Sequence, residues 1–233
     1  MNLNLVIKDI PLEQLEKLKF KCIECSYWFD CDKKNFLEEL SGIKSIRELR
    51  CFLKGKLFEK RNRKDGRKKI ISFRESGGWI KVAFSGRKCI GIILSGRYYL
   101  FPRLKTFNVY PPDFESTFLG CIYVIPEYRD FGIEKRLLFE LEKELIKEKV
   151  KSIETIGKRL NDDIDEDEYE NSPLIPFKFL INNGFYIKKN DPLFPLCRLD
   201  LKSIVSDFAE SKTLIDKVLY KKEVRSPIII KKK

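Results

Sequence analysis

The residue types between positions 124 and 135 suit the binding of an anion. Pro126 ends an apolar stretch, because proline cannot donate the hydrogen bond that a strand interior requires. Gly132 lets the backbone approach a ligand closely where the chain turns into a helix. The first N–H groups of that helix have no carbonyl partner within it and favour a negative group. The segment from Arg129 to Lys135 is therefore predicted to hold an anion such as a pyrophosphate.

Histidine does not occur among the 233 residues, and this narrows the acid–base chemistry open to the chain. Ser–His and Cys–His nucleophiles and histidine metal sites are excluded. A general base must therefore be a carboxylate, a tyrosine, a thiolate or a water molecule.

The seven cysteines are scattered, and Cys22 with Cys25 forms a close pair. An odd number of cysteines without a secretory signal predicts reduced thiols. The pair could supply half of a zinc site with Cys31 and Cys51 as further ligands, but structural zinc commonly uses two close pairs. We predict no metal and interpret the pair as buried or near-surface thiols beside the Tyr-Trp dipeptide that follows, with redox chemistry as the remaining alternative.

The net charge of +12 is concentrated in one stretch. From Lys44 to Arg74 the chain carries 13 basic and 3 acidic residues, a net charge of +10. We call this stretch the basic stripe. It would attract nucleic acid or the phosphates of a cofactor. Its plainer interpretation is a solvated helix face followed by a loop.

Hydrophobic periodicity predicts the elements that must position these residues. Strands are predicted at residues 3–10, 70–73 with 79–84, 89–94, 116–124, 152–156, 185–188 and 197–201. Helices are predicted at residues 12–19, 36–58, 137–146, 174–182 and 204–222. An exposed basic turn is predicted at residues 61–69, which contain an Asp-Gly pair.

The connections between these elements predict how the strands pair. Ser85 and Gly86 form a hairpin turn, so the strands between residues 70 and 124 should form an antiparallel meander. The helix at 137–146 then crosses over, which places the strand at 152–156 parallel to the strand at 116–124.

One domain is expected for a chain of this length. We assign residues 1–201 to it, with a helical basic segment at 33–69, and residues 202–233 to a C-terminal helix and basic tail. The longest run without charge, 11 residues from Ser116 to Pro126, is too short to span a bilayer. The N-terminus does not resemble a signal peptide, so we predict a cytoplasmic protein without a membrane partner.

The stretch at residues 124–134 resembles the cofactor motif of the GNAT superfamily, the acyl-CoA-dependent N-acyltransferases. Members carry valine, any residue, proline, two residues, Arg or Gln, two residues, Gly, any residue, and Gly or Ala. Val124, Pro126, Arg129 and Gly132 match this motif. Residues 177–185 resemble a second motif, a short helix that ends in Gly-Phe before a strand. The resemblance covers residues 79–201.

The resemblance implies a GNAT-like α/β fold of the α+β type, with a mixed, mostly antiparallel central sheet flanked by helices. It implies acetyl-CoA as co-substrate and transfer of its acetyl group to a primary amine by direct attack on the thioester. The cofactor-binding residues that it implies are Ile122, Tyr123, Val124, Arg129, Asp130, Phe131, Gly132, Ile133, Glu134 and Lys135.

Glu134 departs from the superfamily pattern, because Gly or Ala is usual at this position. Together with Asp130 it places two acids within one turn of the predicted pyrophosphate. Both acids suit a helix N-terminus. Toward a bound pyrophosphate, a like charge at contact distance is unfavourable by roughly a few kcal/mol. Lys135 and Arg136 offer compensating charge.

Leu180 is the second departure, because many members place a tyrosine four residues before the glycine that is Gly184 here. That tyrosine donates a proton to the leaving thiolate, which leucine cannot do. The candidate substitutes are Tyr123, Tyr128 and Tyr169.

The resemblance implies that the loop at residues 161–171 borders the acceptor side of the cleft. It holds seven carboxylates between Asp162 and Glu170. These would attract a cationic amine acceptor. Blocks of like charge also occur as solvated loops that repel one another, which is the plainer interpretation.

Three functional classes stay open on the sequence. The first is an N-acetyltransferase that uses acetyl-CoA and an amine acceptor. The second is a catalytically degenerate, CoA-binding protein of the same fold, which Glu134 and Leu180 would explain. The third is a nucleic-acid-binding protein that uses the basic stripe. An N-terminal Cys-x-x-Cys-x-Tyr-Trp motif, which ends at Tyr27 and Trp28, also resembles a subgroup of acetyltransferase-like proteins but implies no substrate. A homodimer is left open.

Overall fold

The computed structural model describes residues 4–18, 20–30, 66–160 and 173–201, with the pairs 45–46, 49–50 and 53–54. The helix predicted at 36–58 lies outside the described residues except for these pairs. The acidic loop at 161–171 and the helix and basic tail predicted beyond residue 202 lie outside them entirely. These elements stay predictions, as does the division of the chain that rests on them.

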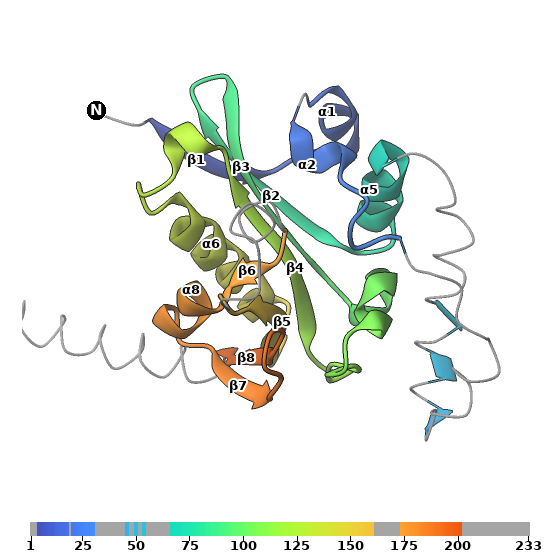
Figure 1. Cartoon of the computed structure of the whole chain (residues 1–233). Helices are drawn as coiled ribbons and strands as arrows, with labels where there is room; N and C mark the ends of the chain where they lie inside the picture. Colours follow the sequence, from blue (N-terminus) through green and yellow to red (C-terminus); the bar gives the residue numbers. More distant parts are fainter. Residues whose placement is uncertain are drawn as a thin grey trace, which may run out of the picture.

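Within the residues that the structure describes, eight strands form one sheet in the order β1-β2-β3-β4-β5-β8-β7, and β6 pairs with β5 beside this path (Figure 1). Neighbouring strands are antiparallel, except that β5 is parallel to both β4 and β6. The predicted fold class, a mixed and mostly antiparallel sheet flanked by helices, is confirmed. The strands are β1 (Leu5–Asp9), β2 (Trp79–Ser85), β3 (Lys88–Gly96), β4 (Thr117–Val124), β5 (Ser152–Lys158), β6 (Ile175–Pro176), β7 (Tyr186–Lys189) and β8 (Leu196–Asp200).

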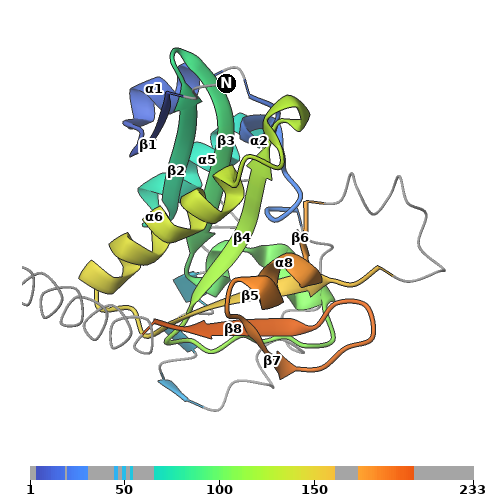
Figure 2. The same cartoon turned by 90° about the vertical axis from the view of Figure 1, so that its left-hand side faces the viewer.

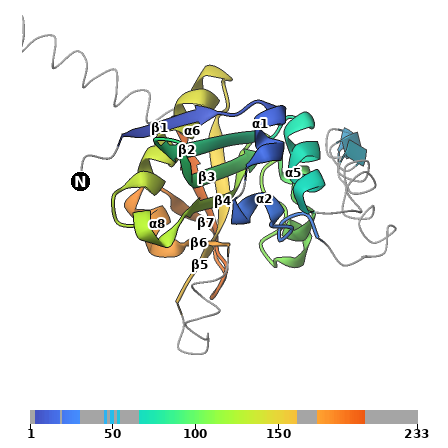
Figure 3. The same cartoon turned by 90° about the horizontal axis from the view of Figure 1, so that it is seen from above.

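Helices cover both faces of the sheet, and each face buries its own hydrophobic cluster. One face carries α1 (Leu12–Lys17), α2 (Lys21–Glu24) and α5 (Gly66–Glu75), and the other carries α6 (Ile133–Lys147) and α8 (Phe177–Asn182) (Figure 3). Figure 2 shows α6 lying across the strands of its face. Short 3-10 helices occur at η1 (Tyr98–Leu100), η2 (Pro102–Thr106) and η3 (Pro126–Tyr128). Within the described residues, no helix has both the length and the apolar character needed to cross a membrane.

The strand predicted at residues 70–73 is wrong, because these residues lie in α5. Ile70 and Phe73 are three residues apart and share the helix face that enters the core, where they are 2% and 0% exposed. A short apolar run fits a strand and a buried helix equally well. The turn predicted at 61–69 is also wrong in part, since residues 66–69 begin α5. The antiparallel meander is confirmed for β2, β3 and β4.

The parallel placement of β4 and β5 through the intervening helix is confirmed. The helix predicted to begin near Leu174 begins at Phe177 instead. Ile175 and Pro176 form β6, which pairs with Gly157 and Lys158 of β5. This small strand therefore lies along the same edge of β5 as β4, at the carboxyl end of β5, where β4 no longer pairs with it.

A buried carboxylate ties together the strands at the far end of the sheet. Glu154 of β5 is 0% exposed and accepts hydrogen bonds from Arg198 Nη1 at 2.9 Å and from Lys188 Nζ at 2.5 Å. Ser116 Oγ and the backbone N–H of Asp113 also donate to it. A buried charge is tolerated only when it is paired and hydrogen-bonded in this way.

Candidate functional site

The site lies where β4 separates from β5. The two strands pair only at Thr117 with Ile153 and at Phe118 with Glu154. At the next position, the hydroxyl of Thr155 donates to the carbonyl of Leu119 at 2.7 Å and takes the place of a backbone bond. Beyond this point β5 pairs with β6, so the carboxyl half of β4 faces an opening instead of a neighbouring strand.

A β-bulge at Gly120 directs this separation. In the pairing of β3 with β4, Leu94 faces Cys121 and the next residue of β3 faces Leu119, so Gly120 is an extra residue in β4. A bulge bends its strand and increases the local twist. A Cβ at Gly120 would lie 2.4 Å from the ring of Phe101, so only glycine fits here.

Trp28 holds the bulge through a hydrogen bond to its backbone. Its Nε1–H donates to the carbonyl of Gly120 at 2.5 Å across 92 residues of sequence. The indole is 3% exposed and meets the rings of Phe101 and Phe118 edge to face, with centroids 6.0 and 5.2 Å away. Such contacts fix a ring in one orientation. The tryptophan of the N-terminal motif therefore sets the geometry of β4.

A cavity of about 810 Å³ occupies the opening. Its walls come from β3, the carboxyl half of β4, the loop before α6, the segment from α2 to the following turn, and the region of β6 and α8. The lining residues are Cys22, Cys25, Tyr27, Trp28, Phe29, Ile70, Ile92, Leu94, Cys121, Ile122, Tyr123, Val124, Pro126, Arg129, Asp130, Gly132, Glu134, Lys135, Lys158, Pro173, Leu174, Ile175, Pro176 and Phe179.

The loop between β4 and α6 turns the helix N-terminus toward the cavity. Asp130 and Gly132 have φ angles of 64° and 71°, in the left-handed region that favours glycine. Gly132 then precedes the first residue of α6, and nothing lies within 4 Å of the place where its Cβ would be. Arg129 Nε donates to the carbonyl of Val124 at 3.4 Å and folds the loop back on the strand. We call residues 126–135 the anion loop.

The charged residues of the anion loop that line the cavity balance one another. Arg129 and Lys135 contribute two positive groups to the cavity wall, and Asp130 and Glu134 contribute two negative ones. Burial raises the pKa of Glu134, and the nearby carboxylate of Asp130 raises it further against the lowering effect of Arg129. The helix N-terminus adds partial positive charge to this balance.

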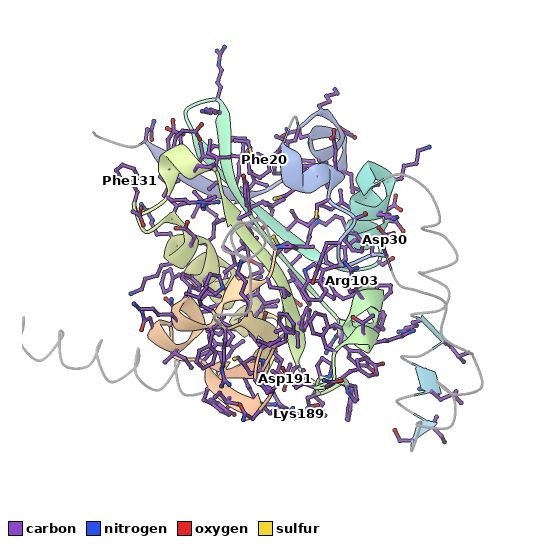
Figure 4. The ribbon with its side chains drawn as sticks, in the orientation of Figure 1. Phe20, Asp30, Arg103, Phe131, Lys189 and Asp191 are labelled. Carbon is purple, nitrogen blue, oxygen red and sulfur yellow. The ribbon has the colours of Figure 1, made fainter. Side chains whose placement is uncertain are left out.

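Eight of the ten predicted cofactor-binding residues line the cavity, and two do not. Phe131 is 55% exposed and lies at the edge of the molecule (Figure 4). Ile133 is 1% exposed, because its side chain packs into the core beneath α6. Only their backbone groups are available to a ligand in the cavity.

The three candidate proton donors differ in their position relative to the cavity. Tyr123 lines the cavity, and burial raises the pKa of its hydroxyl, so the hydroxyl keeps its proton at neutral pH. Tyr128 is not part of the cavity wall, and its ring faces the ammonium group of Lys88 at 5.2 Å. Tyr169 lies outside the described residues.

Helix α8 presents Phe179, not Leu180, to the cavity. Leu180 is 0% exposed and belongs to the core on the α6 face. Its Cδ1 lies 3.1 Å from the place where a Cβ of Gly157 would be, so the leucine packs directly against β5. A tyrosine at position 180 would point into this core.

The thiols of the N-terminal motif belong to the cavity wall. Cys22 and Cys25 line it together with Cys121 of β4. A hydrogen bond with Cys121 and burial raise the pKa of Cys22, which therefore stays a thiol. Among the described residues no group of three or more Cys, Asp or Glu side chains could hold a metal ion. Cys31 and Cys51, the further zinc ligands considered above, lie outside those residues.

Part of the basic stripe is already paired. The ammonium group of Lys69 bonds to Asp30, and Arg74 Nη2 lies 4.0 Å from Asp9. Figure 4 shows Asp30 on the side of the molecule that carries α5. The rest of the stripe is mostly outside the described residues.

Sequence reasoning missed Gly120, Trp28 and Lys158. Gly120 stands in a strand pattern, and an isolated glycine there is a known signal for a bulge. Trp28 sits beside the cysteine pair, but nothing local reveals a partner 92 residues away. Lys158 extends β5 by two residues beyond its predicted end and is 4% exposed in the cavity wall.

Comparison with known proteins gives structural similarities only. No family model and no curated protein sequence matches the chain. Similar solved structures include the PaiA N-acetyltransferase of Thermoplasma acidophilum in complex with coenzyme A, with 18% identity and a TM-score of 0.47 over 85% of this chain and 99% of that one. A GNAT-family acetyltransferase of Listeria monocytogenes has 12% identity and a TM-score of 0.46, over 86% and 98% of the two chains. An acetyltransferase of Thermus thermophilus has 11% identity and a TM-score of 0.45, over 85% and 97%.

Replacing Trp28 with phenylalanine tests the link to the bulge. Trp28→Phe keeps an aromatic ring but leaves the Gly120 carbonyl without its donor and leaves a small cavity. We expect the free energy of unfolding to fall by about 2–4 kcal/mol in urea denaturation followed by circular dichroism. Tyr27→Phe, which removes a hydroxyl from the adjacent ring, is the control and should change it by less than about 0.5 kcal/mol. Equal losses in the two variants would contradict the role of this hydrogen bond.

Proposed function

We propose that the chain is an acyl-CoA-dependent N-acetyltransferase that transfers the acetyl group of acetyl-CoA to a primary amine by direct attack. The observation that carries this proposal is the cavity itself. It joins a helix N-terminus suited to a pyrophosphate with an unpaired strand edge suited to an extended amide chain. We expect the protein to act in the cytoplasm.

The residues fit acetyl-CoA in two parts. The backbone N–H groups at the start of α6, after Gly132, would hold the pyrophosphate, with Arg129 and Lys135 supplying positive charge. The edge of β4 from Ile122 to Val124 would pair with the amide groups of the pantetheine arm, as an added strand does. The thioester would then lie near Cys121, beside the bulge.

The transfer needs positioning and one proton donor. The amine, deprotonated by water, attacks the thioester carbonyl while a backbone N–H of β4 polarises the carbonyl oxygen. The carbon–sulfur bond breaks as the carbon–nitrogen bond forms. Tyr123 donates its proton to the departing thiolate, and water restores that proton. The amine nitrogen releases its second proton to solvent.

The alternative is a catalytically degenerate protein of this fold that binds CoA but does not transfer an acetyl group. One observation favours it: the Glu134 carboxyl lies in the cavity wall where the pyrophosphate would be, and its raised pKa records an unfavourable site for negative charge. Both proposals require CoA binding, so activity alone separates them. The nucleic-acid hypothesis is less favoured, since Lys69 and Arg74 already face acids.

Coenzyme A should stabilise the protein against heat. A ligand that binds only the folded state raises the free energy of unfolding by about 2.7 kcal/mol at a concentration of 100 times its Kd. Thermal unfolding with and without millimolar CoA measures this. Pantetheine, which lacks the pyrophosphate, is the control and should give a smaller rise. No change of the melting temperature with CoA would contradict both the proposal and its alternative.

Replacing Glu134 should strengthen the binding of CoA. In Glu134→Ala the like charge beside the pyrophosphate is gone, and we expect a roughly tenfold lower Kd by calorimetry. The parent should bind more tightly as the pH falls through the raised pKa of Glu134, because the carboxyl then becomes neutral. The variant should lack this part of the pH dependence. Glu140→Ala removes the same charge on α6 outside the cavity and should leave Kd unchanged. Weaker binding by Glu134→Ala would mean that the glutamate helps.

Replacing Tyr123 tests the proton donor. Tyr123→Phe keeps the ring, which packs edge to face on Phe20 with centroids 5.6 Å apart, and removes only the hydroxyl. We expect kcat to fall roughly 10²-fold while the affinity for CoA stays the same. Tyr128→Phe is the matched control and should keep the kcat of the parent. A variant with full kcat would show that solvent protonates the thiolate.

A further inference from the structure

Two thiols from distant parts of the chain meet in the cavity wall. Cys22 of α2 and Cys121 of β4 are joined by a hydrogen bond, and both side chains line the cavity. Each of the two residues is half-buried. Cys25 and Cys89 lie near enough to affect Cys22 electrostatically, but they affect it less than Cys121 does. We call Cys22 and Cys121 the thiol pair.

The thiol pair is held together by contacts on both sides of it. The ring of Phe20, which precedes the first thiol, packs edge to face on Tyr123, which follows the second, with centroids 5.6 Å apart. On the other side, Trp28 donates its hydrogen bond to the carbonyl of Gly120. Figure 3 shows α2 beside β4, in agreement with these contacts. The chain on either side of each thiol is therefore fixed, so the two sulfurs stay close.

The pair found in the structure differs from the one that the sequence suggests. The Cys-x-x-Cys spacing favours Cys22 with Cys25. In the structure Cys25 stands where the chain leaves α2, and the sulfur hydrogen-bonded to Cys22 belongs to β4. A disulfide forms only between cysteines whose backbones hold the two sulfurs close together. Cys121 is therefore the expected partner of Cys22.

The two members of the thiol pair have different roles. The hydrogen bond with Cys121 and burial raise the pKa of Cys22, so this sulfur keeps its proton. A thiol that keeps its proton attacks slowly, since the thiolate is the nucleophilic form. The first attack on a reactive group in the cavity therefore falls to Cys121. Cys22 lies in contact with Cys121 and is placed to act as the resolving thiol in a second step.

We propose that the thiol pair is a redox site that reduces small disulfides which enter the cavity, with Cys121 as the attacking and Cys22 as the resolving thiol. The substrate class is a low-molecular-weight organic disulfide, because its sulfur must reach a half-buried thiol inside a cavity of about 810 Å³. This activity needs neither acetyl-CoA nor an amine. It therefore goes beyond the proposed transfer and does not depend on it.

The reaction exchanges one disulfide for another and balances without a further reactant. Cys121 loses its proton to water and attacks one sulfur of the disulfide R–S–S–R, whose sulfur–sulfur bond breaks. The departing R–S⁻ takes up a proton from water. The Cys22 sulfur then attacks that of Cys121 and releases the second R–S⁻, which takes the proton of Cys22. Two protein thiols are thereby oxidised to one disulfide, and R–S–S–R is reduced to two R–SH molecules.

Exchange with 2-hydroxyethyl disulfide tests the thiol pair on the reduced, full-length protein. Acid quenching, peptide mapping without reductant and mass spectrometry read the state of each cysteine. We expect Cys22 and Cys121 to be joined directly, with at least about tenfold less mixed adduct at either one, because contact gives the second thiol a high effective concentration. A bond between Cys22 and Cys25 in its place, stable adducts on both members of the thiol pair, or two unreacted thiols would overturn the proposal.

Serine variants separate attack from resolution. Cys22→Ser removes the resolving thiol, so we expect one hydroxyethyl adduct to accumulate on Cys121. Cys25→Ser is the matched control in the same cavity wall, and it should form the disulfide as the parent does. Cys22→Ala repeats the first variant with an apolar side chain, and circular dichroism checks that each variant is folded. An unmodified Cys121 in both folded Cys22 variants would overturn its assignment as the attacking thiol.

Assays of acetyl transfer on the same reduced protein separate this inference from the proposed function. A protein that forms the disulfide but transfers no acetyl group would contradict the proposed function and support the redox site. A protein that transfers the acetyl group while the thiol pair stays reduced in 2-hydroxyethyl disulfide would overturn the redox site and leave the proposed function standing.

Discussion

The hydrogen bond from Trp28 to the carbonyl of Gly120 is the constraint on which the site depends. It holds an extra residue in β4 at the point where that strand leaves β5, and Phe101 leaves no room for a side chain there. A bulge in a central strand disturbs the ladder and needs compensation. Here the compensation comes from a buried ring cluster and from the hydroxyl of Thr155, which bonds across the widening gap. The opening between β4 and β5 is therefore held in place by contacts within the core.

The cavity formed by this opening has two ends with different electrostatics. At the anion loop, Arg129 and Lys135 line the cavity with Asp130 and Glu134, so the lining side chains supply little net charge and the helix N-terminus supplies partial positive charge for an anion. The rest of the lining includes the aromatic rings of Tyr27, Trp28 and Phe29 and the thiols of Cys22, Cys25 and Cys121. The cavity therefore joins a charged, helix-capped end to a wall that is largely apolar.

The sequence analysis predicted features that depend on neighbouring residues and missed contacts between segments that are distant in the sequence. Pro126 and Gly132 act within a few residues of themselves, so the turn into α6 and the anion loop could be predicted from their types. The prediction of a strand at residues 70–73 is wrong because four mostly apolar residues are too few to show a helical or a strand period. The partner of Trp28 could not be predicted, because the contact exists only after β4 and the N-terminal segment are folded together.

The position of Leu180 shows how a motif can mislead about chemistry. Counted along the chain, it occupies a place where a tyrosine would serve as proton donor, and its replacement suggests a lost activity. In the structure its side chain is buried against Gly157, and α8 turns Phe179 toward the cavity instead. A hydroxyl at position 180 would therefore be buried away from the cavity. Of the candidate tyrosines in the described residues, Tyr123 is the one that lines the cavity, on the strand that would align the substrate. If the protein supplies the proton for the leaving thiolate, β4 would provide both the edge that binds the substrate and the tyrosine that donates the proton. The bulge at Gly120 sets the course of this strand.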